Sequence, residues 1–248
     1  MGIVKNSLEV DMKKYLLVIA VSIVLLCVTG YTTLMISKSR SFQFFGGITQ
    51  RVDTNEKVVA LTFDDAPTQE TAGVLKELDK LGIKATFFAI GWAIEQYPDE
   101  ARNIVLAGHE LGNHSYSHKR MIFKSPAFVQ NEIEKTDKLI RASGYRGEIY
   151  FRPPNGKKLV LLPMYLKQHN RRTIMWDVEP ETYLEANSEV KEIADYTVSH
   201  VKPGSIILLH PFNQNENTRK AIPVIVSTLQ GRGYKFITLS ELLSYEKK

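Results

Sequence analysis

The stretch Ala60-Leu-Thr-Phe-Asp-Asp-Ala-Pro67 (ALTFDDAP) joins an apolar run to two adjacent carboxylates. The run Val58–Phe63 predicts a buried strand, and Asp64 and Asp65 follow it directly, before a proline. Two neighbouring carboxylates repel each other, so the pKa of one rises unless a cation or a proton lies between them. The stretch therefore predicts either a solvated loop tip or a pair of acids with a shared role.

Downstream of this stretch the chain alternates strand-like and helix-like runs with short links. This alternation predicts right-handed βαβ units and a parallel sheet. The clearest helix is the run 126–143, because Val129, Ile133 and Ile140 fall on one face at a period of about 3.6 residues. About seven units in one domain favour a closed or nearly closed α/β barrel over an open sheet. The expected strands are residues 57–64, 84–91, 109–114, 149–153, 173–178, 205–210 and 235–239, and the expected helices are 69–81, 93–107, 126–143, 160–169, 189–201 and 218–232.

The composition is that of a globular domain, since 44% of the 248 residues are hydrophobic and 24% are charged. The formal net charge is +5; the first 40 residues supply +3 of it, from five basic and two acidic groups, so residues 41–248 hold only +2. No dense basic stripe is present, which argues against a nucleic-acid-binding class. Cys27 is the single cysteine and lies in the apolar N-terminal run, so we expect neither a disulfide framework nor a thiol nucleophile.

The N-terminal run Tyr15–Ile36 has 22 residues without a charge. A helix needs about 20 apolar residues to cross a bilayer, so this run is long enough. A cleaved signal peptide has a shorter apolar core and a small-residue cleavage site, and no A-x-A site follows here. The bulky Leu26 before Cys27 argues against lipidation. We therefore expect an uncleaved anchor with its N-terminus inside, in three parts: a cytoplasmic tip and transmembrane helix over 1–37, a juxtamembrane linker over 38–55, and an exported domain over 56–248.

Polar side chains collect at the ends of the predicted strands, where the active site of an α/β barrel lies. His114 and His118 are four residues apart, so on a helical or turn backbone both imidazoles face one way. Together with one carboxylate they form a set that can hold a catalytic zinc ion and leave positions open for water and substrate. Arg152 follows the fourth strand and His210 the sixth. Beside a reactive aspartate, Arg152 would orient the carboxylate and lower its pKa.

Each of these features also has a simpler interpretation. Most H-x-x-x-H pairs are coincidental, and two aspartates after a strand commonly end a loop or cap a helix. A lone His210 is more often a core or loop histidine, and Arg152 can belong to a surface ion pair. The joint occurrence of these residues at strand ends is what favours a reactive site.

Four motifs in this order resemble those of the polysaccharide deacetylases, also called the NodB homology family or carbohydrate esterase family 4. TFDDAP resembles the family's TFDDGP, and HSYSH matches H-[ST]-x-x-H. RPPNG resembles R-x-P-Y-G, and LLH at 208–210 matches L-x-H. The resemblance covers residues 55–245, nearly all of the expected exported part.

The resemblance implies an α/β fold of the distorted (β/α)7-barrel type and one divalent metal ion. The expected metal is Zn2+, with Co2+, Ni2+ or Mn2+ as alternatives. By analogy, the catalytic residues are Asp64 as general base, His210 as general acid and Arg152 as the residue that orients Asp64. The implied metal ligands are Asp65, His114 and His118, and the implied substrate or oxyanion residues are Asn155, through its backbone N–H, with Pro154, Tyr183 and Leu208.

The chain departs from the family pattern at several positions. Ala66 replaces a glycine, which matters only if that residue needs a positive φ. Asn155 replaces a tyrosine, which removes a ring from the sugar site but keeps a backbone donor. The family's fourth motif, D-x-x-D-W, aligns with Glu179, Thr182 and Tyr183, and Thr182 cannot act as the carboxylate that tunes the general-acid histidine. The candidates to replace that carboxylate are Glu179, Glu181 and Asp177, whereas Trp176 is expected in the barrel core.

The function implied by the resemblance is metal-dependent hydrolysis of N-acetyl groups on an extracellular glycan, a reaction at a carbon–nitrogen bond other than a peptide bond. The expected substrates are peptidoglycan, at N-acetylglucosamine or N-acetylmuramic acid, and chitin-like oligomers. Two alternatives remain open: an O-acetyl esterase for wall or plant polysaccharide, and a glycan-binding or regulatory homologue of low activity. We expect a bacterial, single-pass membrane protein that is monomeric, has its catalytic domain outside the cell and binds no nucleic acid.

Overall fold

The computed structural model describes residues 2–185, 187–213 and 215–246. Its centre is strand β2 (Val58–Ala66), which is buried along its whole length except at Asp65. β2 pairs in parallel with β3 (Thr86–Ala89), β6 (Ile206–Leu209) and β7 (Lys235–Ile237). β4 (Glu110–Asn113) pairs with β3, which gives the order β4-β3-β2-β6. Parallel strands covered on both faces explain why these runs are apolar throughout instead of alternating.

A second, two-stranded ladder joins β1 (Ile48–Thr49) to β5 (Thr173–Ile174), also in parallel. β1 lies within residues 38–55, the expected linker, and pairs there with a strand of the domain. Single bridges continue the pairing from Asn113 to Phe151, from Phe151 to Thr173 and from Val178 to Ile207. The expected strand 149–153 is reduced to the bridge at Phe151, and its expected last residue, Pro153, has no amide hydrogen to donate to a ladder. The prediction of an α/β fold with parallel strands is confirmed.

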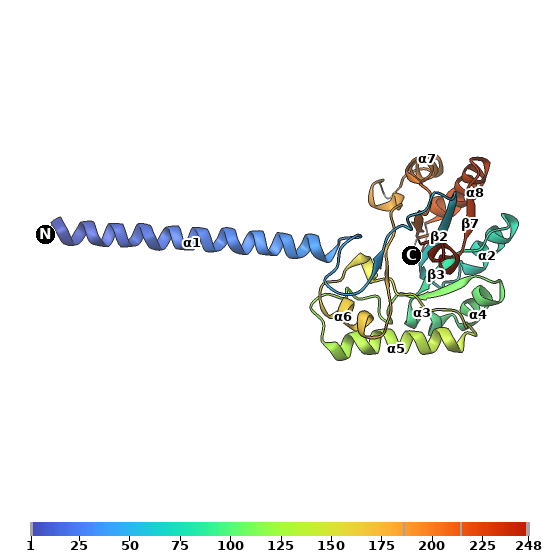
Figure 1. The fold of residues 1–248 in the computed structure, drawn as a ribbon, viewed down its shortest axis with the longest axis horizontal. Coiled ribbons are helices and arrows are strands. Elements are labelled where there is room, and N and C mark those ends of the chain that lie inside the picture. The colour runs from blue at the N-terminus through green and yellow to red at the C-terminus, as the bar shows by residue number, and fades with distance from the viewer. Residues whose placement is uncertain (1, 186, 214, 247–248) are drawn as a thin grey trace.

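Helices surround the strands, with α7 and α8 on one side and α5 and α6 on the other (Figure 1). The expected helix 93–107 is two helices, because Pro98 has no amide hydrogen and begins the second one. The longest helix of the domain is capped by Ser125, whose side chain accepts a hydrogen bond from the amide of Phe128. The helices are α2 (Thr71–Lys80), α3 (Gly91–Gln96), α4 (Pro98–Leu106), α5 (Pro126–Ala142), α6 (Leu161–Gln168), α7 (Val190–His200), α8 (Glu216–Gly231) and α9 (Leu239–Leu243), with 3-10 turns at Pro154–Gly156 and Pro180–Thr182.

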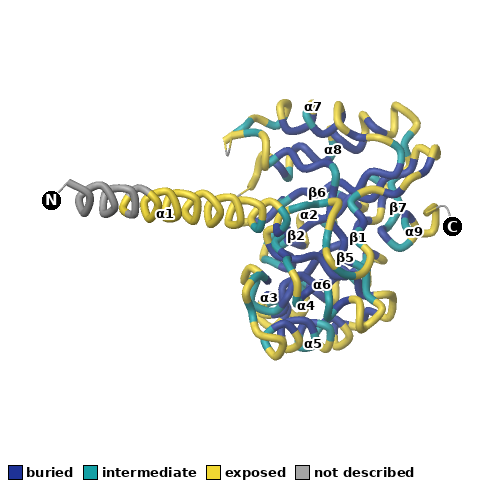
Figure 2. The backbone as a smooth tube through the Cα atoms, turned by 60° about the vertical axis from the view of Figure 1, so that its left-hand side comes forward, coloured by how far each residue is buried: buried dark blue, intermediate teal, exposed yellow. Residues whose placement is uncertain are grey.

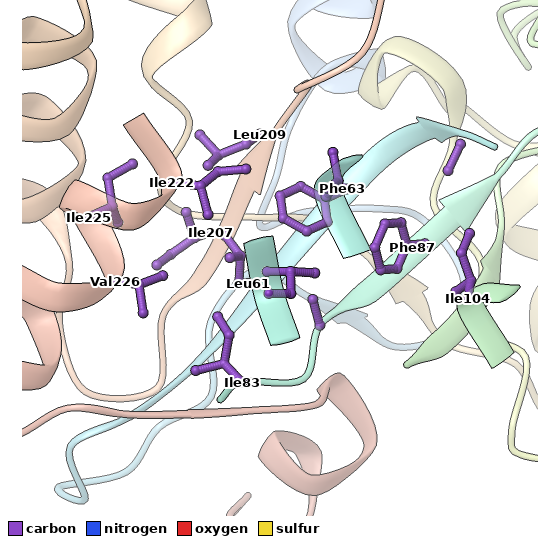
Figure 3. Close-up of a cluster of buried hydrophobic side chains, with 14 of the residues drawn as sticks. Leu61, Phe63, Ile83, Phe87, Ile104, Ile207, Leu209, Ile222, Ile225 and Val226 are labelled. Carbon is purple, nitrogen blue, oxygen red and sulfur yellow. The ribbon is translucent and has the colours of Figure 1, made fainter. Parts of the chain in front are cut away.

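The main core lies between the strands and the helices α2, α4, α7 and α8. Leu61 and Phe63 of β2 pack with Phe87 of β3 and with apolar residues of β6 and α8 (Figure 3). The rings of Phe63 and Phe87 lie 5.1 Å apart between centroids. This packing fixes the frame from which the polar ends of β2, β4 and β6 project.

Helix α1 (Gly2–Ser37) extends away from the domain, and most of its residues whose burial is described are exposed (Figure 2). The segment Lys14–Ser37 is long and apolar enough to cross a membrane, by length and composition. At its other end α1 meets the domain, where Ser37 is 1% exposed. The helix therefore ends in a packed contact with the domain.

Candidate active site

The carboxyl end of β2 directs its two aspartates to different places. Asp64 is buried, whereas Asp65 is partly exposed and has a φ of 67°. The register with β3 shifts between Asp64 and Ala66, so Asp65 is the extra residue of a bulge. A left-handed residue other than glycine costs on the order of 1–3 kcal/mol and is commonly found at functional sites. The unusual residue of this turn is thus Asp65, while Ala66, the substituted glycine position, does not have a positive φ.

Asp64 is held by a fully buried arginine. The Arg152 guanidinium donates to Asp64 Oδ1 at 2.7 Å and to the Thr62 hydroxyl at 2.9 Å, and it lies over the ring of Phe88 at 4.0 Å. Burial raises the pKa of Asp64, but the charge of Arg152, supported by that of His210, outweighs burial and holds the pKa below its ordinary value. Asp64 is therefore ionised at neutral pH and can accept a proton.

Asp65, His114 and His118 converge on one point. Their ligand atoms lie within 4.8 Å of one another, and Asp65 Oδ1 is 3.2 Å from His118 Nε2 and 3.8 Å from His114 Nε2. His114 Nδ1 lies 2.8 Å from the carbonyl oxygen of Arg152, which leaves Nε2 to face Asp65. Burial, the largest cause, lowers the pKa of both imidazoles, so both are neutral, the form that binds metal.

One carboxylate oxygen of this cluster is an unsatisfied hydrogen-bond acceptor. Asp65 Oδ1 is buried and has no hydrogen-bond partner among the described residues. The pKa of Asp65 is raised, mainly by burial and further by the negative charge of the adjacent Asp64. A buried carboxylate oxygen without a partner is costly unless a cation approaches it. One carboxylate and two neutral imidazoles are a ligand set that zinc and similar divalent ions accept, so the residues present fit the implied metal.

The loop after β4 is shaped to present both histidines. The Asn113 side chain accepts a hydrogen bond from the amide of Ser115 at 2.8 Å, and the Ser115 hydroxyl accepts one from the amide of His118 at 3.1 Å. Ser115 and His118 both have positive φ values, 65° and 56°. These local hydrogen bonds stabilise an otherwise unfavourable backbone, which orients the two imidazoles.

His210 follows β6 and is paired with Glu181. The Glu181 Oε1 atom accepts a hydrogen bond from the amide of His210 at 2.9 Å, and Oε2 lies 3.6 Å from His210 Nδ1. Burial lowers the pKa of His210, but Glu181 and the charge of Asp64 outweigh burial and raise the pKa to about 9. His210 is therefore a cation at neutral pH and can donate a proton.

Thr182 stands where the family has the carboxylate that tunes the histidine. Of the three carboxylates that could take over this role, Glu181 is the one that contacts His210. Asp177 instead accepts hydrogen bonds from Ser205 and from the amide of Ile206. Glu179 forms an ion pair with Arg40 at 2.6 Å. Glu179, Glu181 and His210 also lie close enough to form a second candidate metal group. Because Arg40 already neutralises Glu179, the cluster around Asp65 is the stronger candidate.

Asp64, the Asp65 cluster and His210 line one cleft with a volume of about 660 Å³. Tyr183 lies at its edge, 62% exposed, with its ring stacked on Tyr196 at 5.5 Å. Trp176 is mostly buried and borders the cleft, whereas the predicted substrate residue Pro154 is buried and does not line it. Of the predicted site residues, those that line the cleft are Asp64, Asp65, His114, His118, Asn155, Tyr183, Leu208 and His210. No motif indicated that the segment at the end of α1 lines it as well, through Met35, Lys38, Ser39 and Arg40.

The fold and the site define a class: an α/β protein with a cluster of one aspartate and two histidines beside a buried Asp–Arg pair and a Glu–His pair. The family model described as polysaccharide deacetylase matches residues 51–174. The chain is 33% identical to a peptidoglycan-N-acetylglucosamine deacetylase of Bacillus cereus, over 81% of this chain and 95% of that protein. It is also 33% identical to the peptidoglycan-N-acetylmuramic acid deacetylase PdaC of Bacillus subtilis, over 80% of this chain but 41% of that longer protein. The chain belongs to the polysaccharide deacetylase family, and the resemblance found in its motifs is confirmed.

Solved structures agree with this membership. A crystal structure of a peptidoglycan N-acetylglucosamine deacetylase matches with a TM-score of 0.74 and 28% identity, over 80% of this chain and 94% of that chain. A pseudoenzyme of carbohydrate esterase family 4 from Bacillus anthracis matches with a TM-score of 0.73 and 29% identity, over 82% of this chain and 70% of that chain. The family fold thus occurs both in a named deacetylase and in a named pseudoenzyme.

Proposed function

We propose that this protein is a metal-dependent N-deacetylase of an extracellular, acetylated glycan. The observation that carries the proposal is the unpartnered, buried Asp65 Oδ1 between two neutral imidazoles, in the same cleft as an ionised Asp64 and a protonated His210. Asp65, His114 and His118 would hold the ion. A divalent cation there supplies Lewis acidity to the acetyl carbonyl and to water.

The chain's own residues account for the proton transfers. Asp64, oriented by Arg152, accepts a proton from the attacking water as the new C–O bond forms. The amide of Asn155 is proposed to donate to the oxygen that gains negative charge. His210 then donates its proton to the amide nitrogen as the C–N bond breaks, because an unprotonated amine anion leaves poorly. The products are acetate and a free amino sugar.

The cleft edge favours a substrate that carries negative charge. Three basic side chains at this edge have no carboxylate partner in the described part of the chain: Lys38, Lys157 and the neighbouring Arg120. Arg120 instead donates a hydrogen bond to Asn155 Oδ1 at 3.2 Å. Burial, together with the charges of Lys38 and Arg120, lowers the pKa of Lys157. Peptidoglycan carries carboxylates on its stem peptides, whereas chitin oligomers are neutral. We therefore favour peptidoglycan.

The proposal extends to location and architecture. Helix α1 would anchor the protein in a bacterial membrane, with the domain outside as a monomer near the wall. The single bridges at Phe151 and Val178 would close the parallel strands into a distorted barrel. Lys38 and Arg40 follow the helix and would then lie at the outward-facing surface of the membrane that α1 spans.

Acetate release by the full-length chain in detergent tests the proposal. We expect release from purified peptidoglycan, loss of release after chelation and recovery with Zn2+. N-acetylchitooligosaccharides serve as the neutral comparison, and we expect slower release from them. If the metal-loaded protein releases no acetate from either glycan, the result favours the second candidate, a glycan-binding homologue without turnover. The structural similarity to a pseudoenzyme is the reason to test it.

The charge of the cleft edge gives a separate prediction. Replacing Lys157 by alanine should raise KM for peptidoglycan fragments about threefold to tenfold, because a partly exposed charge pair contributes about 1 kcal/mol. KM for neutral chitooligosaccharides should stay unchanged. Lys191→Ala, which removes an exposed lysine paired with Asp195 on α7, is the control. An equal rise in KM for both glycans would show that Lys157 does not recognise the negative charge of the substrate.

A further inference from the structure

The segment that joins α1 to the domain is part of the active-site cleft. Lys38, Ser39 and Arg40 line the cavity that also contains Asp64 and His210. The backbone of this segment is docked, since the carbonyl of Ser37 accepts a hydrogen bond from the amide of Lys158 at 2.9 Å. The carbonyl of Ser39 accepts a further bond from the ammonium group of the same lysine, which is 1% exposed. The segment is thus held by two hydrogen bonds from the buried Lys158, at the point where α1 reaches the domain (Figure 1).

Arg40 makes the most specific contact of this segment. Its guanidinium lies 2.6 Å from Glu179 Oε2 and 4.6 Å from the centre of the Trp176 ring. The same carboxylate oxygen accepts hydrogen bonds from Trp176 Nε1 at 2.9 Å and from the Thr182 hydroxyl. Glu179 is 7% exposed, and Arg40 is its one ion-pair partner within the described ranges. Without Arg40, a buried carboxylate would lose its counter-charge, which is costly.

A short turn connects this ion pair to His210. Glu179 precedes the 3-10 turn Pro180–Thr182, and the middle residue of that turn is Glu181. The carboxylate of Glu181 contacts both the amide and Nδ1 of His210. The turn is therefore fixed at its start by Arg40 and presents Glu181 to the histidine two residues later.

We propose that Arg40 is a positioning residue for the deacetylation reaction: by holding Glu179 it places Glu181 against His210, so that the segment after the apolar helix completes the active site. This inference rests on the proposed function, because its effect on turnover requires the protein to be an enzyme. It follows that a soluble fragment starting at residue 41 would lack part of the active site. It also follows that, if α1 spans a bilayer, the cleft opens beside the membrane surface.

The test uses the full-length chain in detergent with three single variants. Arg40→Ala should lower kcat about tenfold to a hundredfold, the effect expected when a catalytic group is displaced, while KM and bound metal stay within about twofold of wild type. Arg40→Lys should recover part of kcat because it keeps the charge. Arg172→Ala is the control: it removes the ion pair between Arg172 and Glu246, which lies outside the cleft, and should leave kcat unchanged.

A double-mutant cycle separates positioning from general stabilisation. If Arg40 acts through Glu181, adding Arg40→Ala to Glu181→Gln should cause less than about a twofold further loss of kcat. Fully additive losses, or wild-type kcat for Arg40→Ala, would overturn the proposal. Should Arg40→Ala fail to fold, Glu179→Gln removes the same ion pair, keeps a hydrogen-bond acceptor and takes its place in the cycle.

Hydrogen exchange gives a measurement that does not require activity. The amides of Tyr183 and Leu184 donate to the carbonyl of Pro180, so they report on the turn. Arg40→Ala should speed their exchange about tenfold relative to wild type and to Arg172→Ala. Unchanged exchange would overturn the positioning role. An inactive wild-type protein with faster exchange in Arg40→Ala would instead reject the proposed function and retain the structural link.

Discussion

Asp65→Ala is expected to lower the affinity for divalent metal by more than about a hundredfold and to reduce acetate release from peptidoglycan to background. Loss of a residue that only orients a metal ligand already costs about tenfold to a hundredfold in affinity, and Asp65 is assigned as a ligand itself. The change leaves two imidazoles and removes the one charged oxygen between them. Metal content per chain after dialysis, measured together with acetate release, checks this result.

Two companion variants make the result decisive. Alanine is strained at the φ of 67° that Asp65 adopts, so Asp65→Gly, which tolerates this backbone, separates lost coordination from lost stability. Glu181→Ala removes a member of the other candidate metal group, Glu179, Glu181 and His210, and should leave metal content unchanged. If Asp65→Gly retains one tightly bound ion and Glu181→Ala loses it, the metal site has been assigned to the wrong cluster.

The adjacency of the two aspartates shows how far the sequence could predict this site. Their position after a buried strand, and their division between two roles, could be proposed because successive strand residues point to opposite faces. From the sequence, backbone strain could be expected at Ala66, because this residue replaces the glycine that is usual there. The structure shows the strain at Asp65 instead, because the bulge against β3 inserts its extra residue there. Alternation of side chains alone could not reveal an inserted residue.

The choice of Glu181 among three candidate carboxylates, and the contact of Arg40, could not be made from sequence patterns for a different reason. Three acidic residues lay within five positions of one another, and only the path of the turn Pro180–Thr182 decides which carboxylate meets His210. Arg40 and Glu179 are 139 residues apart, so no local periodicity connects them. Motifs predict residues whose spacing is fixed by a strand or a turn, whereas such long-range pairs depend on how separate segments pack.

His210→Ala is expected to reduce N-deacetylation about 10²-fold to 10⁴-fold, the usual contribution of a positioned general acid. The loss should be far smaller for an O-acetylated substrate, because an alcohol leaves more readily than an amine without prior protonation. Acetate release from N-acetylated and O-acetylated glycans, measured side by side, checks this difference. His200→Ala, an exposed histidine on α7, is the matched control and should leave both rates unchanged. Equal losses on both substrates would reject His210 as the acid for the amine.

The pH dependence of the same reaction tests whether Glu181 keeps His210 protonated. Its pKa is raised to about 9, so the protonated form is fully present at neutral pH and is lost as the pH rises through that value. The alkaline limb of kcat should therefore fall near pH 9 in the wild type. Glu181→Gln removes the carboxylate while burial, which lowers the pKa, remains, so the limb should move to lower pH by more than about one unit. An alkaline limb that stays in place would mean that Glu181 does not control the proton on His210, and Arg40 would then have no route to the reaction through it.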